Sequence, residues 1–407
     1  MPNLLATKAF RGAIALLVIL SVGASCGMAV YKPSGFLPLR TVTYQEMAMA
    51  QALLQVGAGE IDSARKQIDS LLSKTPNFRL AQLVKGDLLL ARTRPIETVG
   101  NAGAALPEEM AALRQEARAR LMRYHLESPG NRIPRYLLQM PASYRHAIVV
   151  DSSTSTMYVF ENQQGIAHYI ADYYVTVGKN GTNKLKEGDK RTPVGLYFSS
   201  ERLPSRQLTD FYGRAAYPIS YPNEWDRRLG RSGHGIWVHG VPPDTYSRPP
   251  RASDGCVVLS NQDLEVLSKQ LDLGETPVVI TDGIEWVSAP QLTDLRAKMY
   301  ENIELWRRDW ETRNVEAYLK HYSPSFEAGK MGFKEFASQK RKINAEKSWI
   351  RVTLNDVSMF LYPGRDDLAV VNFTQNYSSN NLTNEMKKRQ YWLRDTEGWR
   401  IIYEGSA

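Results

Sequence analysis

Two stretches in the first third of the chain show helical spacing of their apolar residues. From 44 to 92, and again from 106 to 136, apolar residues recur at intervals of three and four, as on one face of an α-helix. Residues 59–76 resemble the second half of a tetratricopeptide repeat, although a plain helical spacer has the same spacing. We therefore predict an α-helical, tetratricopeptide-like region over 36–140.

The pattern changes to short apolar runs in the middle of the chain. Residues 147–150, 157–160 and 169–177 have the length of strands and are rich in β-branched or aromatic residues, and 277–281 adds a further run. Helical spacing is sparse between these runs. The pattern predicts a mainly-β domain over 143–282.

A long helix followed by strands is expected in the last third. Residues 292–318 return to helical spacing, and the segments after them alternate as a half-buried antiparallel sheet does. The strand-like segments are 350–360, 368–377, 387–394 and 399–404. We predict an α+β domain over 291–407, in which the helix packs on a curved sheet.

An uncharged stretch near the N-terminus indicates export. Lys8 and Arg11 precede 12–30, which contains no charged residue and is rich in Ala, Leu, Ile and Val. We predict that 1–35 is a signal or anchor segment and that the rest of the chain lies in the periplasm or on the extracytoplasmic face of the inner membrane. An uncleaved anchor, a cleaved signal and a lipid anchor on Cys26 all fit the segment.

Composition and charge narrow the classes of function. With 43% hydrophobic and 23% charged residues, the chain resembles folded multi-domain proteins and not polytopic membrane proteins. Its net charge of +8 suits an anionic partner, but no dense basic run with interleaved aromatics points to nucleic acid. The six histidines lack the spacing of a zinc site, and no glycine-rich phosphate loop follows a strand, so we expect no metal or cofactor.

One of the two cysteines is the predicted nucleophile. Cys26 lies in the apolar segment, so Cys256 is the single thiol of the exported part and has no disulfide partner there. A thiol with an ordinary pKa is only slightly ionised at neutral pH, so a nucleophilic cysteine needs a neighbouring base. His239 ends an apolar strand shortly before Cys256 and is the predicted base.

Gly255 precedes the thiol and permits a tight turn there, because it has no Cβ. The backbone N–H groups of Gly255 and Cys256 are predicted to stabilise the oxyanion of an acyl-transfer reaction. Loss of one such donor typically lowers the rate by about 10²–10³.

These residues resemble a known family. His239–Gly240, a loop, and Ser253–Asp254–Gly255–Cys256 together are similar to the signature of the L,D-transpeptidase catalytic domain. Further similar segments occur upstream in the same order: Gly178–Lys179, Gly188–Asp189, Thr192–Tyr197 and Tyr221–Asn223.

The resemblance implies an enzyme that acts on peptidoglycan stem peptides. Cys256 would attack the carbonyl of the third residue of a tetrapeptide and release D-Ala, while the carbonyl of Gly240 orients His239. An amine acceptor would give a 3→3 cross-link or attach a protein to the wall, and water would make the enzyme an L,D-carboxypeptidase. The residues do not separate these outcomes.

The chain departs from the family at two positions. Asp254 replaces a second histidine, and Val258 replaces the Asn or Arg that most relatives carry. We expect Arg251 to bind the substrate carboxylate in place of that residue. Ser253, Asp254 and His234 are further candidates for substrate contacts, although turn and surface roles are the alternatives for Asp254 and His234.

The last third resembles the nuclear-transport-factor-2-like (NTF2-like) fold. The similar segments include Trp306–Trp310, Tyr322–Phe326 and Gly398–Ile401. Similar domains follow the catalytic domain in some L,D-carboxypeptidases and L,D-transpeptidases that shape cells. The resemblance implies binding of a partner or dimerisation. A non-catalytic, wall-binding scaffold is the alternative function from another class.

Overall fold

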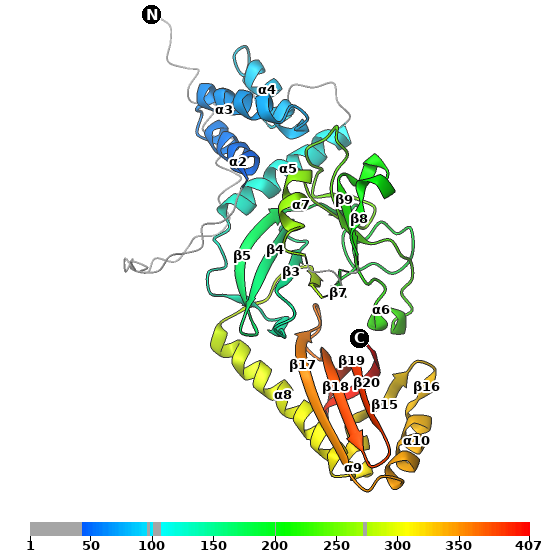
Figure 1. Cartoon of the computed structure of the whole chain (residues 1–407). Helices are drawn as coiled ribbons and strands as arrows, with labels where there is room; N and C mark the ends of the chain where they lie inside the picture. The colour runs from blue at the N-terminus through cyan, green and yellow to red at the C-terminus, as the bar shows by residue number, and fades with distance from the viewer. Residues whose placement is uncertain (1–42, 96–97, 101–106, 200, 272–274) are drawn as a thin grey trace, which may run out of the picture.

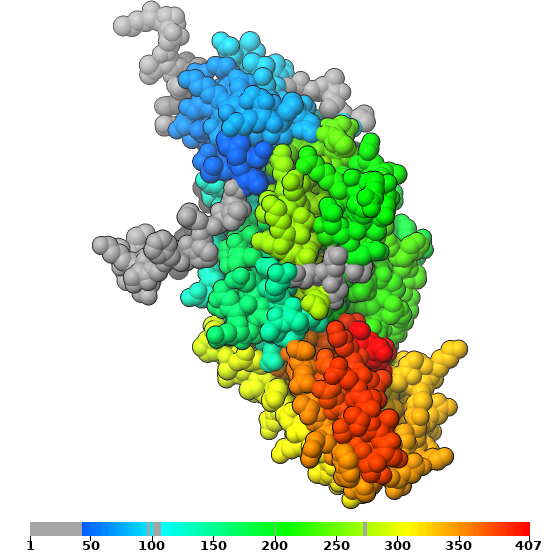
Figure 2. All heavy atoms as spheres, viewed as in Figure 1, coloured from blue at the N-terminus to red at the C-terminus, as the bar shows by residue number. Residues whose placement is uncertain are grey.

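The computed structural model describes residues 43–95, 98–100, 107–199, 201–271 and 275–407 (Figure 1). The segment predicted as a signal or anchor, 1–35, lies outside these ranges. No helix within them is long and apolar enough to cross a membrane. The helical region and the C-terminal domain lie on opposite sides of the middle domain (Figure 2).

The N-terminal region is helical, as predicted. Its helices are α2 (Tyr44–Gly57), α3 (Ile61–Lys74), α4 (Arg79–Leu90) and α5 (Pro107–His125). Small and aliphatic residues at helical spacing, among them Ala52, Ile68 and Leu71, are fully or almost fully buried in one cluster. Tyr246 of the middle domain joins this cluster, so the helices pack against that domain.

The helices end earlier than the predicted limit of 140. After His125 the chain forms two short strands, β1 (Ile133–Pro134) and β2 (Leu137–Gln139). β1 pairs with β14 (Trp286–Val287), and β2 pairs with a strand of the C-terminal domain. The apolar residues of this segment therefore belong to sheets, because their partners come from residues far along the chain.

The middle domain is built from two main sheets. The order of the first is β5-β4-β3-β13-β7, and the order of the second is β12-β10-β9-β8. A separate parallel pair joins β6 to β11. One buried cluster draws Val150 and Val278 from the first sheet and Val238 and Val257 from the second, so the sheets share a core. The bounds are β3 (His146–Asp151), β4 (Thr156–Gln163), β5 (Ile166–Tyr174), β6 (Val177–Gly178), β7 (Gly195–Phe198), β8 (Leu203–Pro204), β9 (Ala215–Pro218), β10 (Trp237–His239), β11 (Arg251–Ser253), β12 (Val257–Val258) and β13 (Pro277–Thr281), with the helices α6 (Glu224–Arg228) and α7 (Asn261–Leu267).

The single helix expected over 292–318 is divided in two. α8 (Ala289–Glu311) ends before Arg313, whose φ of +61° interrupts the helical backbone. Asn314 then caps α9 (Val315–Lys320) by accepting a hydrogen bond from the Ala317 N–H. The change of direction brings both helices against the C-terminal sheet.

The four predicted C-terminal strands are present, and three further elements complete the domain. The strands are β17 (Ile350–Leu361), β18 (Leu368–Ser379), β19 (Thr383–Asp395) and β20 (Gly398–Ser406). The additions are β15 (Tyr322–Ala328), β16 (Met331–Gly332) and α10 (Phe333–Ala345). Phe336 and Ala337 are the buried residues of α10, so its sequence carries only a weak apolar stripe.

The middle and C-terminal domains share a sheet and a core. The seven-stranded sheet has the order β16-β15-β20-β19-β18-β17-β2, so its last strand precedes the middle domain in sequence. One buried cluster contains Leu196 and Phe198 of the middle domain with Phe360 and Tyr362 of the C-terminal domain. The two domains are therefore packed together and not joined by a free linker.

Candidate active site

Two paired strands bring the predicted nucleophile and base into one region. β10 and β12 are parallel neighbours, with His239 opposite Val258 and Val238 opposite Val257. Cys256 directly precedes β12, so its side chain lies near the strand that ends in His239. His239 is 1% exposed, whereas Cys256 is only partly buried.

The His239 ring is held in one orientation. Its Nδ1 lies 2.6 Å from the carbonyl oxygen of Gly240, and the Tyr212 ring packs edge-on at 5.0 Å. A carbonyl oxygen only accepts hydrogen bonds, so Nδ1 carries the proton and Nε2 has a free lone pair. Burial and the charge of Arg248 outweigh the hydrogen bond to Gly240, which acts in the opposite direction, and lower the pKa of His239 to about 4. The ring is thus neutral at pH 7.

The thiol of Cys256 is also neutral at pH 7. Burial raises its pKa to about 11, although the Trp237 N–H and the charge of Arg248 act in the opposite direction. Its hydrogen-bond acceptor is the carbonyl oxygen of Gly235, at 3.4 Å. The thiol therefore points at the backbone of the preceding loop in this structure.

The turn before the thiol requires a glycine and uses the Gly255 N–H internally. Gly255 has a φ of +126°, and an added Cβ would lie 2.8 Å from the carbonyl oxygen of Arg191. Its N–H donates to Ser253 Oγ at 3.1 Å, and the Ser253 hydroxyl donates to the Cys256 carbonyl at 2.6 Å. The Gly255 N–H is therefore engaged within the turn in this structure, and its role at an oxyanion stays a prediction.

Ser253, predicted as a substrate contact, is engaged within the same turn. It is 2% exposed, and both of its hydrogen bonds lie within the turn. A side chain so enclosed fixes the shape of the turn and is not available to a substrate.

The upstream motifs converge on this turn. Thr192 Oγ1 accepts from the Gly178 N–H at 2.8 Å and donates to the Gly255 carbonyl at 2.9 Å. An added Cβ at Gly178 would lie 2.5 Å from the Lys190 carbonyl oxygen, so this position also needs a glycine. Segments that lie far apart in the sequence thus brace the residue before the nucleophile.

Asp189 organises the loop beside the turn. Desolvation opposes its ionisation, but hydrogen bonds from Lys184 Nζ and from the N–H groups of Leu185, Lys186 and Arg191 lower its pKa to about 2. Lys184 is 3% exposed, and its charge favours the thiolate of Cys256. The loop therefore places a buried cation near the site.

The other predicted substrate residues lie at the surface. Asp254 forms an exposed ion pair with Lys179 Nζ at 3.1 Å, and His234 lies 3.7 Å from an exposed Glu187 carboxylate. Arg251 is exposed on β11, whose backbone pairs with β6. Of these side chains, Asp254 raises the pKa of the Cys256 thiol through its negative charge.

Arg248 is a residue that the sequence analysis missed. Its guanidinium lies 4.3 Å from the centre of the Phe211 ring and donates to the Phe211 carbonyl at 3.3 Å. The Phe211 ring in turn lies 6.2 Å from the His239 ring. Arg248 sits in a loop without a recognisable motif, so no sequence signal marks it.

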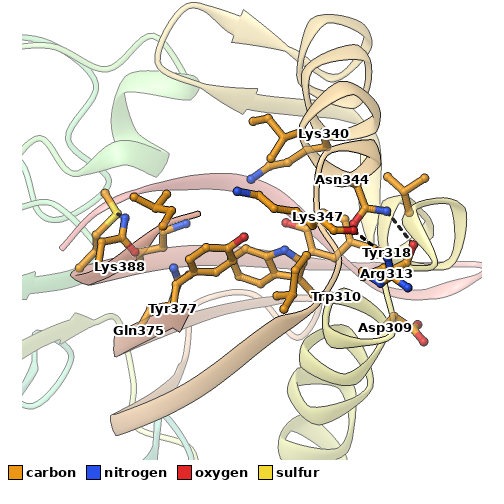
Figure 3. Close-up of a pocket in the computed structure, with 16 residues that line it drawn as sticks. Asp309, Trp310, Arg313, Tyr318, Lys340, Asn344, Lys347, Gln375, Tyr377 and Lys388 are labelled. Carbon is orange, nitrogen blue, oxygen red and sulfur yellow. Dashed lines mark hydrogen bonds between the residues drawn. The ribbon is translucent and has the colours of Figure 1, made fainter. Parts of the chain in front are cut away.

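A second candidate site lies in the C-terminal domain (Figure 3). Trp310 and Tyr377 stack with ring centres 5.4 Å apart, and Lys340 and Lys347 extend toward these rings. Lys388 also lines the pocket, and burial lowers the pKa of Lys340. Asp309 pairs with His321 at 2.7 Å, but its carboxylate points away from the rings.

Comparisons with known proteins agree with the two-domain description. A model described as the L,D-transpeptidase catalytic domain matches residues 145–280, and a model described as the Cds6 C-terminal NTF2-like domain matches 298–405. The structure of Bdellovibrio bacteriovorus Bd1075 is 30% identical, the match covers 68% of this chain and 98% of that chain, and the TM-score is 0.61.

The helical cell shape determining protein Pgp2 from Campylobacter jejuni is also similar. It is 23% identical, the match covers 66% of this chain and 95% of that chain, and the TM-score is 0.56. At this identity the likeness concerns the fold alone. A search of curated proteins found no match.

Proposed function

Because this chain belongs to the L,D-transpeptidase family and carries an NTF2-like domain, we propose that it is a cysteine L,D-transpeptidase that modifies peptidoglycan stem peptides. The proposal is supported by one observation: Cys256 directly precedes β12, and the paired strand β10 ends in His239, whose neutral ring is oriented by the Gly240 carbonyl. A family that acts on peptidoglycan works outside the cytoplasm, which agrees with the export segment predicted over 1–35.

The proposed reaction begins with a neutral thiol and a neutral imidazole. The thiol turns from the Gly235 carbonyl toward Nε2 of His239, which accepts the proton as sulfur attacks the carbonyl carbon of the third stem residue. We assign the Cys256 N–H to the resulting oxyanion, because the Gly255 N–H is engaged by Ser253. His239 then gives the proton to the amine of the departing D-Ala, which leaves a thioester on Cys256.

The second half of the reaction resolves the thioester. An amine of another stem peptide attacks it, His239 accepts the amine's proton, and the thiol is restored as a 3→3 cross-link forms. If water attacks instead, the product is a tripeptide and the enzyme is an L,D-carboxypeptidase, which is the alternative function. Both outcomes use the same groups in this chain.

The C-terminal domain contributes binding and not catalysis in this proposal. Its pocket combines three lysines with stacked aromatic rings, a surface suited to a ligand that carries negative charge beside an apolar or ring-shaped face. We propose two further partners. One is another protein or a second copy of this chain, and the other is the membrane, reached through an anchor within 1–35.

Purified protein incubated with a disaccharide tetrapeptide tests the proposal. Mass spectrometry would show cross-linked dimers for a transpeptidase and tripeptide plus free D-Ala for a carboxypeptidase. Cys256→Ala is the control and should give neither. If the wild-type protein also gave neither product, and no adduct formed on Cys256 with a carbapenem, the non-catalytic scaffold would be favoured.

A further inference from the structure

We propose that Arg248 binds a carboxylate of the stem peptide beside the scissile bond, and that the helical region positions Arg248 through the loop 241–250. The inference rests on the proposed function for the identity of the ligand. Its geometric part concerns only residues of this chain.

Arg248 is a partly buried cation without an ion-pair partner. Among the residues that the structure describes, no Asp or Glu forms an ion pair with its guanidinium, which rests instead on the face of Phe211. The negative charge of Asp254 acts on Arg248, but its carboxylate pairs with Lys179. A guanidinium has five N–H donors in a planar fork. Arg248 uses one of them in its hydrogen bond to the Phe211 carbonyl, which leaves most of the others available to an anion.

Arg248 lies close to the reacting groups. Its guanidinium rests 4.3 Å from the centre of the Phe211 ring, which lies 6.2 Å from the His239 ring. Its positive charge also lowers the pKa of both the Cys256 thiol and the His239 ring. An Arg–carboxylate contact in such a partly desolvated place is a strong, directional hydrogen bond.

The loop that carries Arg248 is attached to the helical region. Tyr246 is 4% exposed and packs its ring on Phe78 with centres 4.5 Å apart. Its N–H donates to the Asn77 carbonyl at 3.2 Å, and the Asn77 side chain donates to the Pro243 carbonyl at 3.0 Å. The turn between α3 and α4 thus holds the first half of the loop.

Two carboxylates of the helices hold the residues next to Arg248. The Tyr246 hydroxyl donates to Glu46 Oε1 at 3.3 Å, and the Ser247 hydroxyl donates to Glu116 Oε1 at 2.7 Å. Both carboxylates also form ion pairs with Arg120, which is 2% exposed. One buried arginine of α5 therefore fixes both acceptors.

The same arginine reaches Arg248 by a third route. The Arg120 guanidinium lies 4.1 Å from the centre of the Tyr174 ring, and the Tyr174 hydroxyl donates to the Arg248 carbonyl at 3.0 Å. Thr176 Oγ1 donates to that carbonyl at 3.0 Å as well. The backbone of Arg248 is consequently fixed from both sides, which sets the direction of its side chain.

Alkylation of Cys256 tests the placement of Arg248 without any peptidoglycan substrate. Iodoacetate is an anion and iodoacetamide is neutral, but both react with the thiolate, so the ratio of their rates cancels any change in the thiol pKa. Peptide mapping of the full-length protein distinguishes Cys256 from Cys26. Arg248→Gln should lower the iodoacetate-to-iodoacetamide ratio several-fold.

Arg251→Gln is the matched control, because it removes the same charge from an exposed position three residues away. It should leave the ratio within about twofold of wild type, since exposed charges are screened by salt. An unchanged ratio in Arg248→Gln, or an equal change in Arg251→Gln, would overturn the assignment of Arg248.

A double-variant comparison tests the positioning role of the helical region. Tyr246→Phe combined with Ser247→Ala removes both hydroxyls that reach the helices and should lower the ratio toward that of Arg248→Gln. The same pair of changes introduced into Arg248→Gln should have no further effect. Ser268→Ala, which removes an exposed serine contact on the same domain, is the control, and thermal unfolding verifies that each variant is folded.

If the double variant keeps the wild-type ratio, or if it lowers the ratio equally in the Arg248→Gln background, the helices do not act through Arg248. Either result would overturn the proposal that the helical region positions Arg248, and neither would change the identity of the nucleophile.

Substrate kinetics test the ligand. For the tetrapeptide, Arg248→Gln should raise KM by roughly ten- to hundredfold with a smaller effect on kcat, and Arg248→Lys should restore part of the loss. Two amidated peptides, one modified at the C-terminus and one at the side-chain carboxylate, identify which carboxylate is bound. The peptide that lacks the bound carboxylate should give the same KM with wild type and with Arg248→Gln.

An equal KM for wild type and Arg248→Gln would overturn the carboxylate assignment, provided that wild type turns the tetrapeptide over. Absence of turnover by wild type would instead count against the proposed function. The alkylation ratio would still decide whether Arg248 acts at the thiol.

Discussion

Removal of the C-terminal domain should unfold the middle domain. A chain that ends at Asp282 loses β14, the partner of β1, and β17, the partner of β2. It also exposes Leu196, Phe198 and Trp225, which are 2%, 7% and 7% exposed in the full chain. The sequence alone suggests independent domains, whereas the shared core predicts that the truncated chain is not stably folded.

The magnitude follows from the groups uncovered. Exposing a large apolar side chain costs about 1.5–3 kcal/mol, so these three together cost about 5–9 kcal/mol. The Asn223 amide also loses the Tyr362 hydroxyl, and the Glu224 carboxylate loses Tyr391, at about 0.5–1.5 kcal/mol for each hydrogen bond that is exchanged for one with water. The total approaches the stability of a typical domain, which is about 5–15 kcal/mol.

Circular dichroism and acylation by a carbapenem measure the outcome. The full chain should unfold with the middle and C-terminal domains in one transition, and the truncated chain should show neither a cooperative transition nor an adduct.

Phe360→Ala is a milder version, because Phe360 is 0% exposed and its ring centre lies 6.3 Å from that of Phe198. It should cost about 3–5 kcal/mol. Leu382→Ala, at a position that is 49% exposed, is the control. A truncated chain that melts cooperatively and acylates at the full rate would refute the shared-core argument.

Three further predictions concern the site. His239→Ala should slow carbapenem acylation by about 10²–10⁴, whereas the exposed His234→Ala should leave the rate nearly unchanged; equal effects measured by intact mass would contradict the choice of base. Because the pKa of His239 is lowered to about 4, protonation should abolish its role as base only as the pH falls through about 4, so an acylation rate already lost near pH 6.5 would count against the buried, neutral ring. Gly255→Ala should remove acylation while the fold is retained, because the new Cβ would meet the Arg191 carbonyl at a φ of +126°; wild-type acylation rates in that variant would show that the turn is not required.

The strands of the middle domain were predictable because each one is marked by a run of consecutive apolar residues. Residues 147–150 and 277–281 lie within β3 and β13, and their near-continuous apolar runs are typical of strands buried on both faces. The thiol turn and the histidine strand could also be located from the sequence, since each consists of neighbouring residues. The apolar pattern and the sequence motifs thus identify the strands and turns that are determined by neighbouring residues.

The features that the sequence did not reveal depend on contacts between residues far apart in the chain. Residues 133–139 carry apolar side chains that fit a helix or a strand, and only pairing with β14 and β17 decides between them. The hydrogen bond between the Gly255 N–H and Ser253 Oγ could not be predicted, because it depends on the geometry of the turn. Arg251 was named as a carboxylate ligand because it lies close to Cys256 in sequence, and that assignment stays a prediction. Arg248 carries no sequence signal, because its place beside Phe211 depends on the fold.

In the proposed reaction, the two domain contacts have a role in substrate placement. The thiol of Cys256 and the ring of His239 are neutral, so the proposed attack depends on placing the peptide carbonyl within reach of the thiol and not on a preformed ion pair. The helical region fixes the loop that carries Arg248 through Glu46 and Glu116, and the C-terminal domain covers the opposite end of the domain through Phe198. A substitution in either contact should therefore change substrate positioning before it changes the chemistry of the thiol, because the Cys256 turn is braced separately by Thr192.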